Sequence, residues 1–258
     1  LDNVKLAARA QKHVLVEKPI ARTAWEAESM IEMAKGASIK FMVAENYRFL
    51  NTVNKCKDLI EQDAIGDLRL IEIHMVYSAQ DLGGWRRSNI LRGGGIVIDA
   101  GVHYIDLMVN IGGLPKSIYA VIPPSSLSII EGEDGAVITA RFDNGVVGLV
   151  NIYAGTLITE KQEIIHITGT QGQIRFYPYG NEVILDTSDE IPTFEVPDSG
   201  RGHMAMFSEF KNAILQDKKP QMSGEEGLRD LLVVLAAYRS ADTGNAVAID
   251  ITNHAGRG

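Results

Sequence analysis

The 258-residue sequence predicts an α/β unit followed by an α+β domain with a mainly antiparallel sheet. Two observations carry this prediction. Before residue 45 a short apolar strand, a helix and a second apolar strand follow closely, which is the pattern of a βαβ unit with two parallel strands. From residue 68 onward, short strands separated by turn residues recur, which is typical of antiparallel hairpins. We therefore expect two domains, 1–48 and 49–258.

The first domain opens in helical periodicity and continues through the βαβ unit. Thr23 begins its helix, because Glu26 three residues later completes a capping box. The helix stops near Gly36. The predicted elements are a helix end within 1–11, a strand at 13–16, a helix at 24–34 and a strand at 40–44.

The second domain begins with a helix closed by Gly66. Its strongest turn signal is Asp143-Asn144-Gly145, which favours a tight hairpin. One face of such a sheet packs on the core and the other is available to a partner subunit. The predicted elements are helices at 51–62, 204–216 and 224–242, and strands at 68–78, 117–122, 136–142, 145–154, 163–168, 172–177 and 182–185.

A helix of unusual composition lies between these strands. It follows three glycines, 93–95, and is apolar on most of its surface. Its polar residues are Asp99, His103, Asp106 and Asn110, whose spacing puts them on one stripe. Short carboxylates, an imidazole and an amide suit a cleft better than bulk water. Two other readings of the stripe stay open: a simple helix-surface pair, or two metal ligands at Asp99 and His103, for which no third ligand is evident.

Polar residues also follow both strands of the βαβ unit. Ligands in open α/β sheets gather at the carboxyl ends of the strands, where Lys18 and the segment 46–48 fall. The backbone of Lys18 is restricted by Pro19, so its ammonium group is well placed to stabilise negative charge on a substrate oxygen. The alternative is that Glu17 and Lys18 form a solvated pair at a strand end.

Composition excludes some partners. The net charge of −8 argues against nucleic acid and anionic membranes, which need a basic surface. No apolar run approaches the ~20 residues that span a bilayer. Cys56 is the only cysteine, so no intrachain disulfide is possible, and we expect a cytoplasmic protein.

Three motifs, in this order, resemble the Gfo/Idh/MocA family of NAD(P)-dependent oxidoreductases. The first is Glu17-Lys18-Pro19 after an apolar strand, and the second is Asn46-Tyr47-Arg48-Phe49 after the next. The third is the glycine triplet 93–95 with Asp99, His103 and Asp106. The likeness extends from His13 to Val247 and includes Tyr238-Arg239-Ser240-Ala241 near the end.

The resemblance implies roles for individual residues. Lys18 contacts the reacting hydroxyl group and the nicotinamide region, His103 is the general acid/base, and Asp99 binds or orients the substrate. The implied cofactor is NAD or NADP, and no metal is expected. The implied cofactor-binding residues are Glu17, Lys18, Pro19, Asn46 and Arg48. The expected substrate-binding residues are Lys18, Tyr47, Trp85, Arg86, Asp99 and His103. Trp85 and Arg86 are included because they lie on a loop that could cover the site, and a packed aromatic side chain is an equal alternative for Trp85.

One motif of the family is absent from this sequence. No Gly-x-Gly-x-x-Gly turn occurs, so we expect the chain to begin within the last third of a Rossmann domain, and we assign activity to the parent protein. The expected substrate is a sugar, cyclitol or related polyol. An NAD-assisted glycosidase or lyase and a non-catalytic oligomerisation fragment remain alternatives. We expect a homodimer or homotetramer formed through the antiparallel sheet.

Overall fold

The computed structural model describes residues 1–80 and 82–249. The first part of the chain forms the predicted βαβ unit. It comprises α1 (Asp2–Arg9), β1 (Val14–Glu17), α2 (Ala24–Gly36) and β2 (Phe41–Ala44). The two strands pair in parallel, with Val14 opposite Phe41 and Glu17 opposite Ala44. Thr23 caps α2 as expected, because its side chain accepts a hydrogen bond from the backbone N–H of Glu26.

The second part is built on a mixed, mostly antiparallel sheet of nine strands within the described residues. Their order is β10-β9-β8-β7-β3-β6-β5-β4-β11, and only β3 and β6 run parallel. The strands are β3 (Leu68–Val76), β4 (Ser117–Val121), β5 (Gly135–Arg141), β6 (Val147–Tyr153), β7 (Gln162–Gly169), β8 (Gly172–Phe176), β9 (Glu182–Thr187), β10 (Thr193–Glu195) and β11 (Val247–Ala248). The predicted fold class is confirmed.

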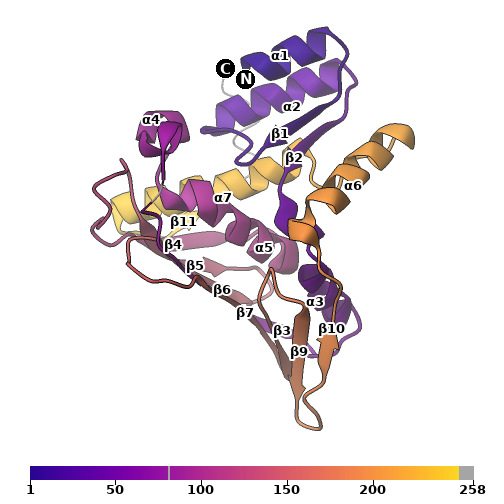
Figure 1. Cartoon of the computed structure of the whole chain (residues 1–258), viewed down its shortest axis with the longest axis vertical. Helices are drawn as coiled ribbons and strands as arrows, with labels where there is room; N and C mark the ends of the chain where they lie inside the picture. Colours follow the sequence, from indigo (N-terminus) through magenta and orange to yellow (C-terminus); the bar gives the residue numbers. More distant parts are fainter. Residues whose placement is uncertain (81, 250–258) are drawn as a thin grey trace.

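Two long helices separate this sheet from the βαβ unit (Figure 1). They are α5 (Val102–Gly112), which continues a π-helical turn η3 (Val97–Gly101), and α7 (Gly224–Thr243). Ile98, Ile105 and Met108 are fully buried and place the central helix in the core. A methyl group on Gly148 of β6 would lie 2.5 Å from the sulfur of Met108, so this glycine allows the helix to approach the sheet closely.

The C-terminal helix begins against the first strands. The N–H of Val43 donates to the carbonyl of Met222 at 2.8 Å, and Met42 forms an antiparallel bridge with Ser223. Residues just before α7 therefore extend the two-stranded sheet. The division at residue 48 stays a prediction, and this contact brings a distant part of the sequence back to the first unit.

The remaining helices lie outside the two sheets. They are η1 (Asn46–Phe49), α3 (Asn51–Glu61), η2 (Gly84–Arg87), α4 (Asn89–Arg92), η4 (Gly200–Gly202) and α6 (His203–Leu215).

One apolar segment is longer than the sequence analysis expects. The helical stretch from Asn89 to Gly112 has 24 residues, and its most apolar 18-residue window has a mean hydropathy of 1.2, so it is long and apolar enough to cross a membrane. Of that window, 78% is buried inside the protein. Its apolar character thus serves the core of this fold.

Candidate active site

Two adjoining cavities open at the carboxyl ends of the parallel strands. The larger has a volume of about 630 Å³ and the smaller about 370 Å³. Both are lined by Lys18, Arg86, His103, Tyr179 and Arg201. The larger is also lined by Leu15, Glu17, Ala44, Asn46, His203, Met206 and Phe207. The smaller is also lined by Tyr47, Met75, Tyr77, Leu82, Asp99, Ala100, Tyr104 and Lys161.

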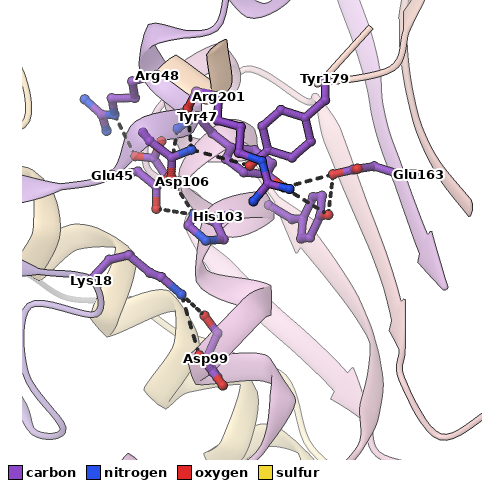
Figure 2. A network of polar contacts seen from close by, with 12 residues as sticks. Lys18, Glu45, Tyr47, Arg48, Asp99, His103, Asp106, Glu163, Tyr179 and Arg201 are labelled. Atoms are coloured by element: carbon purple, nitrogen blue, oxygen red, sulfur yellow. Dashed lines mark hydrogen bonds and ion pairs between the residues drawn. The ribbon is translucent and has the colours of Figure 1, made fainter. Parts of the chain in front are cut away.

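Lys18 is anchored on the π-helical turn of the central helix. Its Nζ donates to the backbone carbonyl of Asp99 at 2.6 Å and lies 3.6 Å from the Oδ1 atom of the same residue (Figure 2). The carboxylate of Asp99 also lies 3.7 Å from Arg86 Nε and 3.8 Å from Arg92 Nη1. Three cations therefore surround one carboxylate at the rim of the smaller cavity.

His103 is held by a buried carboxylate. Its Nδ1 lies 2.7 Å and 2.8 Å from the two carboxylate oxygens of Glu45, whose residue is only 1% exposed. Tyr47 stacks on the imidazole with ring centroids 4.5 Å apart and an angle of 10° between the rings. A carboxylate at Nδ1 keeps the proton on that nitrogen, and Nε2 is then the atom that can accept a proton from a ligand in the cavity.

The environment of Glu45 favours its charged form. Burial acts to raise the pKa of this carboxyl group, but the charge of His103 and the hydrogen bonds from His103 and from the backbone N–H of Tyr47 outweigh it and lower the pKa. Glu45 thus remains an acceptor for the imidazole at neutral pH.

The predicted polar stripe divides into two halves. Asp99 and His103 contribute to the lining of these two cavities, whereas Asp106 and Asn110 line neither. Asp106 is fully buried and accepts a 2.6 Å hydrogen bond from Arg48 Nε, and Asn110 accepts from Lys57 Nζ at 2.9 Å. The cleft interpretation is wrong for these two residues, because η1 and α3 pack against the second half of the stripe.

The other predicted cofactor-binding residues differ in position. Glu17 and Asn46 line the larger cavity. Pro19, joined to Lys18 by a cis peptide bond, lines neither cavity. Arg48 is 5% exposed, is paired with Asp106 and with Glu226, and also lines neither cavity. The cofactor-binding roles of all of these residues stay predictions.

Most of the predicted substrate-binding residues border one cavity. Tyr47, Asp99, His103 and Lys18 all border the smaller cavity, as does Arg86 from η2. Trp85 is 54% exposed and borders neither cavity. It contacts the site indirectly, through the Arg86 guanidinium group 5.6 Å from the centre of its ring.

Sequence reasoning missed a group of tyrosines around one carboxylate. Tyr47 donates to Glu163 Oε1 at 3.0 Å (Figure 2). Tyr104 donates to the same oxygen, and Lys161 Nζ lies 2.7 Å from Oε2. Burial is the main cause that raises the pKa of Tyr47 and of Tyr104, and the charge of Glu163 raises both pKa values further. Both hydroxyl groups therefore stay protonated. Glu163 comes from β7, far along the chain, and no local motif marks it.

Glu45 and Arg201 were also missed. Glu45 follows an apolar strand, so the strand-end argument that selected Asn46 could have found it. Arg201 reaches the site from η4, where its backbone carbonyl accepts a 2.7 Å hydrogen bond from Asn46 Nδ2. The described residues contain no group of three or more metal-ligating side chains close enough to hold an ion.

Comparison with protein families agrees with this arrangement. Residues 57–249 match the family model described as the oxidoreductase family C-terminal alpha/beta domain, and residues 2–45 match the model of its NAD-binding Rossmann fold. The fold is that of a two-part oxidoreductase. The chain belongs to the Gfo/Idh/MocA oxidoreductase family.

Relatives with assigned activities act on sugars and cyclitols. The chain is 28% identical to 1,5-anhydro-D-fructose reductase of Ensifer adhaerens over 95% of this chain and 74% of that protein. It is 26% identical to myo-inositol 2-dehydrogenase of Thermotoga maritima, with 94% and 74% covered. Among solved structures, aldose-aldose oxidoreductase of Caulobacter crescentus, complexed with glycerol, superposes with a TM-score of 0.87 at 26% identity, covering 96% of this chain and 75% of that one.

Proposed function

We propose that the protein carrying this chain transfers hydride between NAD or NADP and a secondary hydroxyl or carbonyl group of a sugar, cyclitol or related polyol. The observation that carries the proposal is the meeting of Lys18, Asp99 and His103 at two adjoining cavities beyond the parallel strands. The names of the relatives support it, since they are reductases and dehydrogenases of such substrates.

The residues of the larger cavity fit the nicotinamide end of a dinucleotide. Leu15 and Ala44 offer apolar contact to a ring, while Glu17 and Asn46 offer polar partners to an amide or to ribose hydroxyl groups. The phosphate-binding glycine turn does not occur in this sequence, so these residues would contact only the nicotinamide end of the dinucleotide. A bound NAD(P) supplies the hydride acceptor or donor.

The protein's own groups then handle the proton and the developing charge. In the oxidising direction Nε2 of His103 takes the hydroxyl proton, and Glu45 stabilises the imidazolium that results. Lys18 Nζ stabilises the substrate oxygen while it becomes a carbonyl oxygen. Asp99, whose carboxylate borders the smaller cavity, accepts hydrogen bonds from neighbouring hydroxyl groups and orients the ring. Reduction uses the same groups in reverse.

The first test replaces the proposed acid/base. We expect His103→Ala to lower kcat by about 10²- to 10⁴-fold in an assay of polyol-dependent NAD(P)H formation, because proton transfer contributes about that much. His13→Ala is the matched control, since His13 is an exposed histidine just before β1 and lines neither cavity. Unchanged circular dichroism shows that the variants fold.

Two results would contradict the proposal. Wild-type rates in His103→Ala would favour a non-catalytic role for this chain. Product formation without net NAD(P)H accumulation would favour the glycosidase or lyase alternative.

We also infer that the protein self-associates through one face of its antiparallel sheet. Apolar side chains on three adjacent strands of that face are 36–51% exposed. They are Tyr119 and Val121 on β4, Val137 on β5, and Val147 and Leu149 on β6. An apolar patch of this kind on a sheet is typical of an interface between subunits.

A further inference from the structure

The candidate site collects positive charge in an acidic protein. The whole chain has a net charge of −8. Four cationic side chains nevertheless line the smaller cavity, and Asp99 is the only acidic residue among its lining residues. The cations are Lys18, Arg86, Lys161 and Arg201. Such a local excess raises the concentration of anions at the mouth of a cleft.

The carboxylates near the cavity do not balance these cations. Asp99 is shared by Lys18, Arg86 and Arg92, and the buried Nη1 atom of Arg92 has no hydrogen-bond partner within the described residues. Glu163 is paired with Lys161, but two tyrosine hydroxyl groups also donate to it. Cationic groups at the cavity therefore outnumber the carboxylates beside them, and this excess favours an anionic ligand.

Arg201 is a cation at the cavity that has no carboxylate partner among the described residues. Among residues 1–80 and 82–249, no carboxylate lies within 4.0 Å of its guanidinium group, which lies 5.7 Å from the centre of the Tyr179 ring. Lys161 Nζ lies 5.7 Å from the centre of the same ring. Two cations thus lie near one aromatic side chain, and both border the smaller cavity.

The backbone holds Arg201 in an uncommon conformation. Its φ angle is 61°, between two glycines that also have positive φ. The turn is fixed from outside, because Asn46 binds the Arg201 carbonyl and a methyl group on Gly202 would lie 2.4 Å from the backbone oxygen of Asn46. Strained residues of this kind cluster at active sites and ligand clamps, and Arg201 has this backbone conformation at the border of a cavity.

We propose that the substrate carries a carboxylate group, which Arg201 and Lys161 bind at the smaller cavity. This inference rests on the proposed function and names its substrate class: a sugar acid or a related polyhydroxy acid. A planar guanidinium group can bind a carboxylate through two parallel hydrogen bonds, and the ammonium group of Lys161 adds a second positive charge. A neutral polyol would leave the guanidinium group of Arg201 without an anionic partner, whereas Lys161 keeps its pair with Glu163.

Direct binding tests the proposal without a dinucleotide. Calorimetric titration compares D-glucuronate with D-glucose and D-galacturonate with D-galactose, since each pair differs only in a carboxylate. We expect at least one acid to bind about tenfold or more tightly than its neutral partner, and Arg201→Gln to remove that preference while leaving the neutral sugar unchanged. Arg239→Gln, which alters an exposed arginine on α7, is the matched control and should retain the preference.

Three results would overturn the proposal. Equal binding of acids and neutral sugars would do so, as would equal weakening of both by Arg201→Gln. Tighter binding of D-glucose 6-phosphate than of either acid would reject the carboxylate in favour of a phosphate ester.

Kinetics separate this proposal from the function on which it rests. In the protein carrying this chain, we expect Arg201→Gln to raise KM for the acid about tenfold or more and to leave KM for NAD(P) unchanged. A rise in KM for NAD(P) instead would assign Arg201 to the cofactor and overturn the inference. His103-dependent oxidation of neutral polyols alone would retain the function and reject the carboxylate. Arg201-dependent binding of an acid without hydride transfer would retain the carboxylate and reject the proposed function.

Discussion

At the scale of single residues, the contact between Glu45 and His103 organises the site. Both oxygens of the buried carboxylate lie within 2.8 Å of Nδ1, and the stacked ring of Tyr47 limits the tilt of the imidazole. Glu45 lines neither of the two cavities, so it acts through His103 as a positioning residue.

This contact predicts a split between turnover and binding. We expect Glu45→Gln to lower kcat about 10²-fold with little change in KM, because a neutral amide no longer fixes the Nδ1 proton or stabilises the imidazolium. Glu45→Asp should recover part of the loss. Steady-state kinetics of both variants provide the measurement, and a rise in KM with unchanged kcat would contradict the positioning role.

A second buried cluster links Arg48, Asp106 and Asp230. Burial, only partly offset by Arg48, raises the pKa of Asp106 to about 7, and burial together with the charge of Asp106 raises the pKa of Asp230. A carboxyl group whose pKa is raised by folding stabilises the folded state fully below its unfolded pKa. That contribution is lost as the pH rises through about 7.

The sign of this effect can be tested with one substitution. We expect Asp230→Asn to gain stability relative to the wild type as the pH rises from about 5 to 8, because the variant lacks the buried carboxyl group whose raised pKa makes folding less favourable at higher pH. Urea unfolding at several pH values measures the difference. An exposed control, Asp67→Asn, should show no such trend, and a difference that shrinks with rising pH would contradict the account.

The sequence could locate a residue at the cavities where a motif follows the end of a strand. Lys18 and Asn46 follow apolar strands and line the larger cavity, so their location was accessible from apolar runs alone, while their roles stay predictions. Arg201 and Glu163 reach the site through tertiary packing of η4 and β7, which no local pattern encodes. Asp106 was misassigned because helical spacing fixes a face but not the element that covers it.

At the scale of elements, the start of the central helix depends on a neighbouring helix. The hydroxyl group of Tyr238 on α7 accepts hydrogen bonds from the N–H groups of Gly95 and Ile98 and donates to Glu133. These groups position the π-helical turn that contains Asp99. A methyl group on Gly94 would lie 2.2 Å from the same hydroxyl oxygen.

This packing predicts a cost for a small substitution. We expect Gly94→Ala to destabilise the protein by about 1–3 kcal/mol, because Tyr238 must move to make room. Gly36→Ala is the control: a methyl group there meets nothing within 4 Å, so its effect should be neutral or stabilising by about 0.4–1 kcal/mol. Thermal unfolding compares the two, and equal stabilities would contradict the assigned contact.

Elements with a strong local sequence pattern could be predicted, and elements without such a pattern could not. The capping residue Thr23 and the hairpin before β6 gave correct predictions, because each has a local physical cause. The π-helical turn and the short strands β10 and β11 were not predicted. The two strands have only three and two residues, which is too few to show a periodic pattern, and β11 pairs with a strand that is distant in sequence.

At the scale of the whole molecule, the exposed sheet face predicts self-association. We expect Val137→Asp to shift an oligomer toward monomers, because the side chain is 45% exposed among apolar neighbours on β4 and β6. Leu215→Asp on α6 is the control, since that side chain is 71% exposed and lies on another element. Sedimentation velocity measures both, and a wild-type monomer at all concentrations would contradict the proposed interface.

The whole-molecule claim is that this fold brings a proton acceptor and a cation to the carbon that exchanges hydride. The most direct measurement follows deuterium from a polyol or polyhydroxy acid labelled at the reacting carbon into the nicotinamide ring, by mass spectrometry, with wild type and His103→Ala side by side. We expect labelled NAD(P)H from the wild type and at least ~10²-fold less from the variant. Absence of label in the wild type, or equal labelling by both proteins, would contradict it.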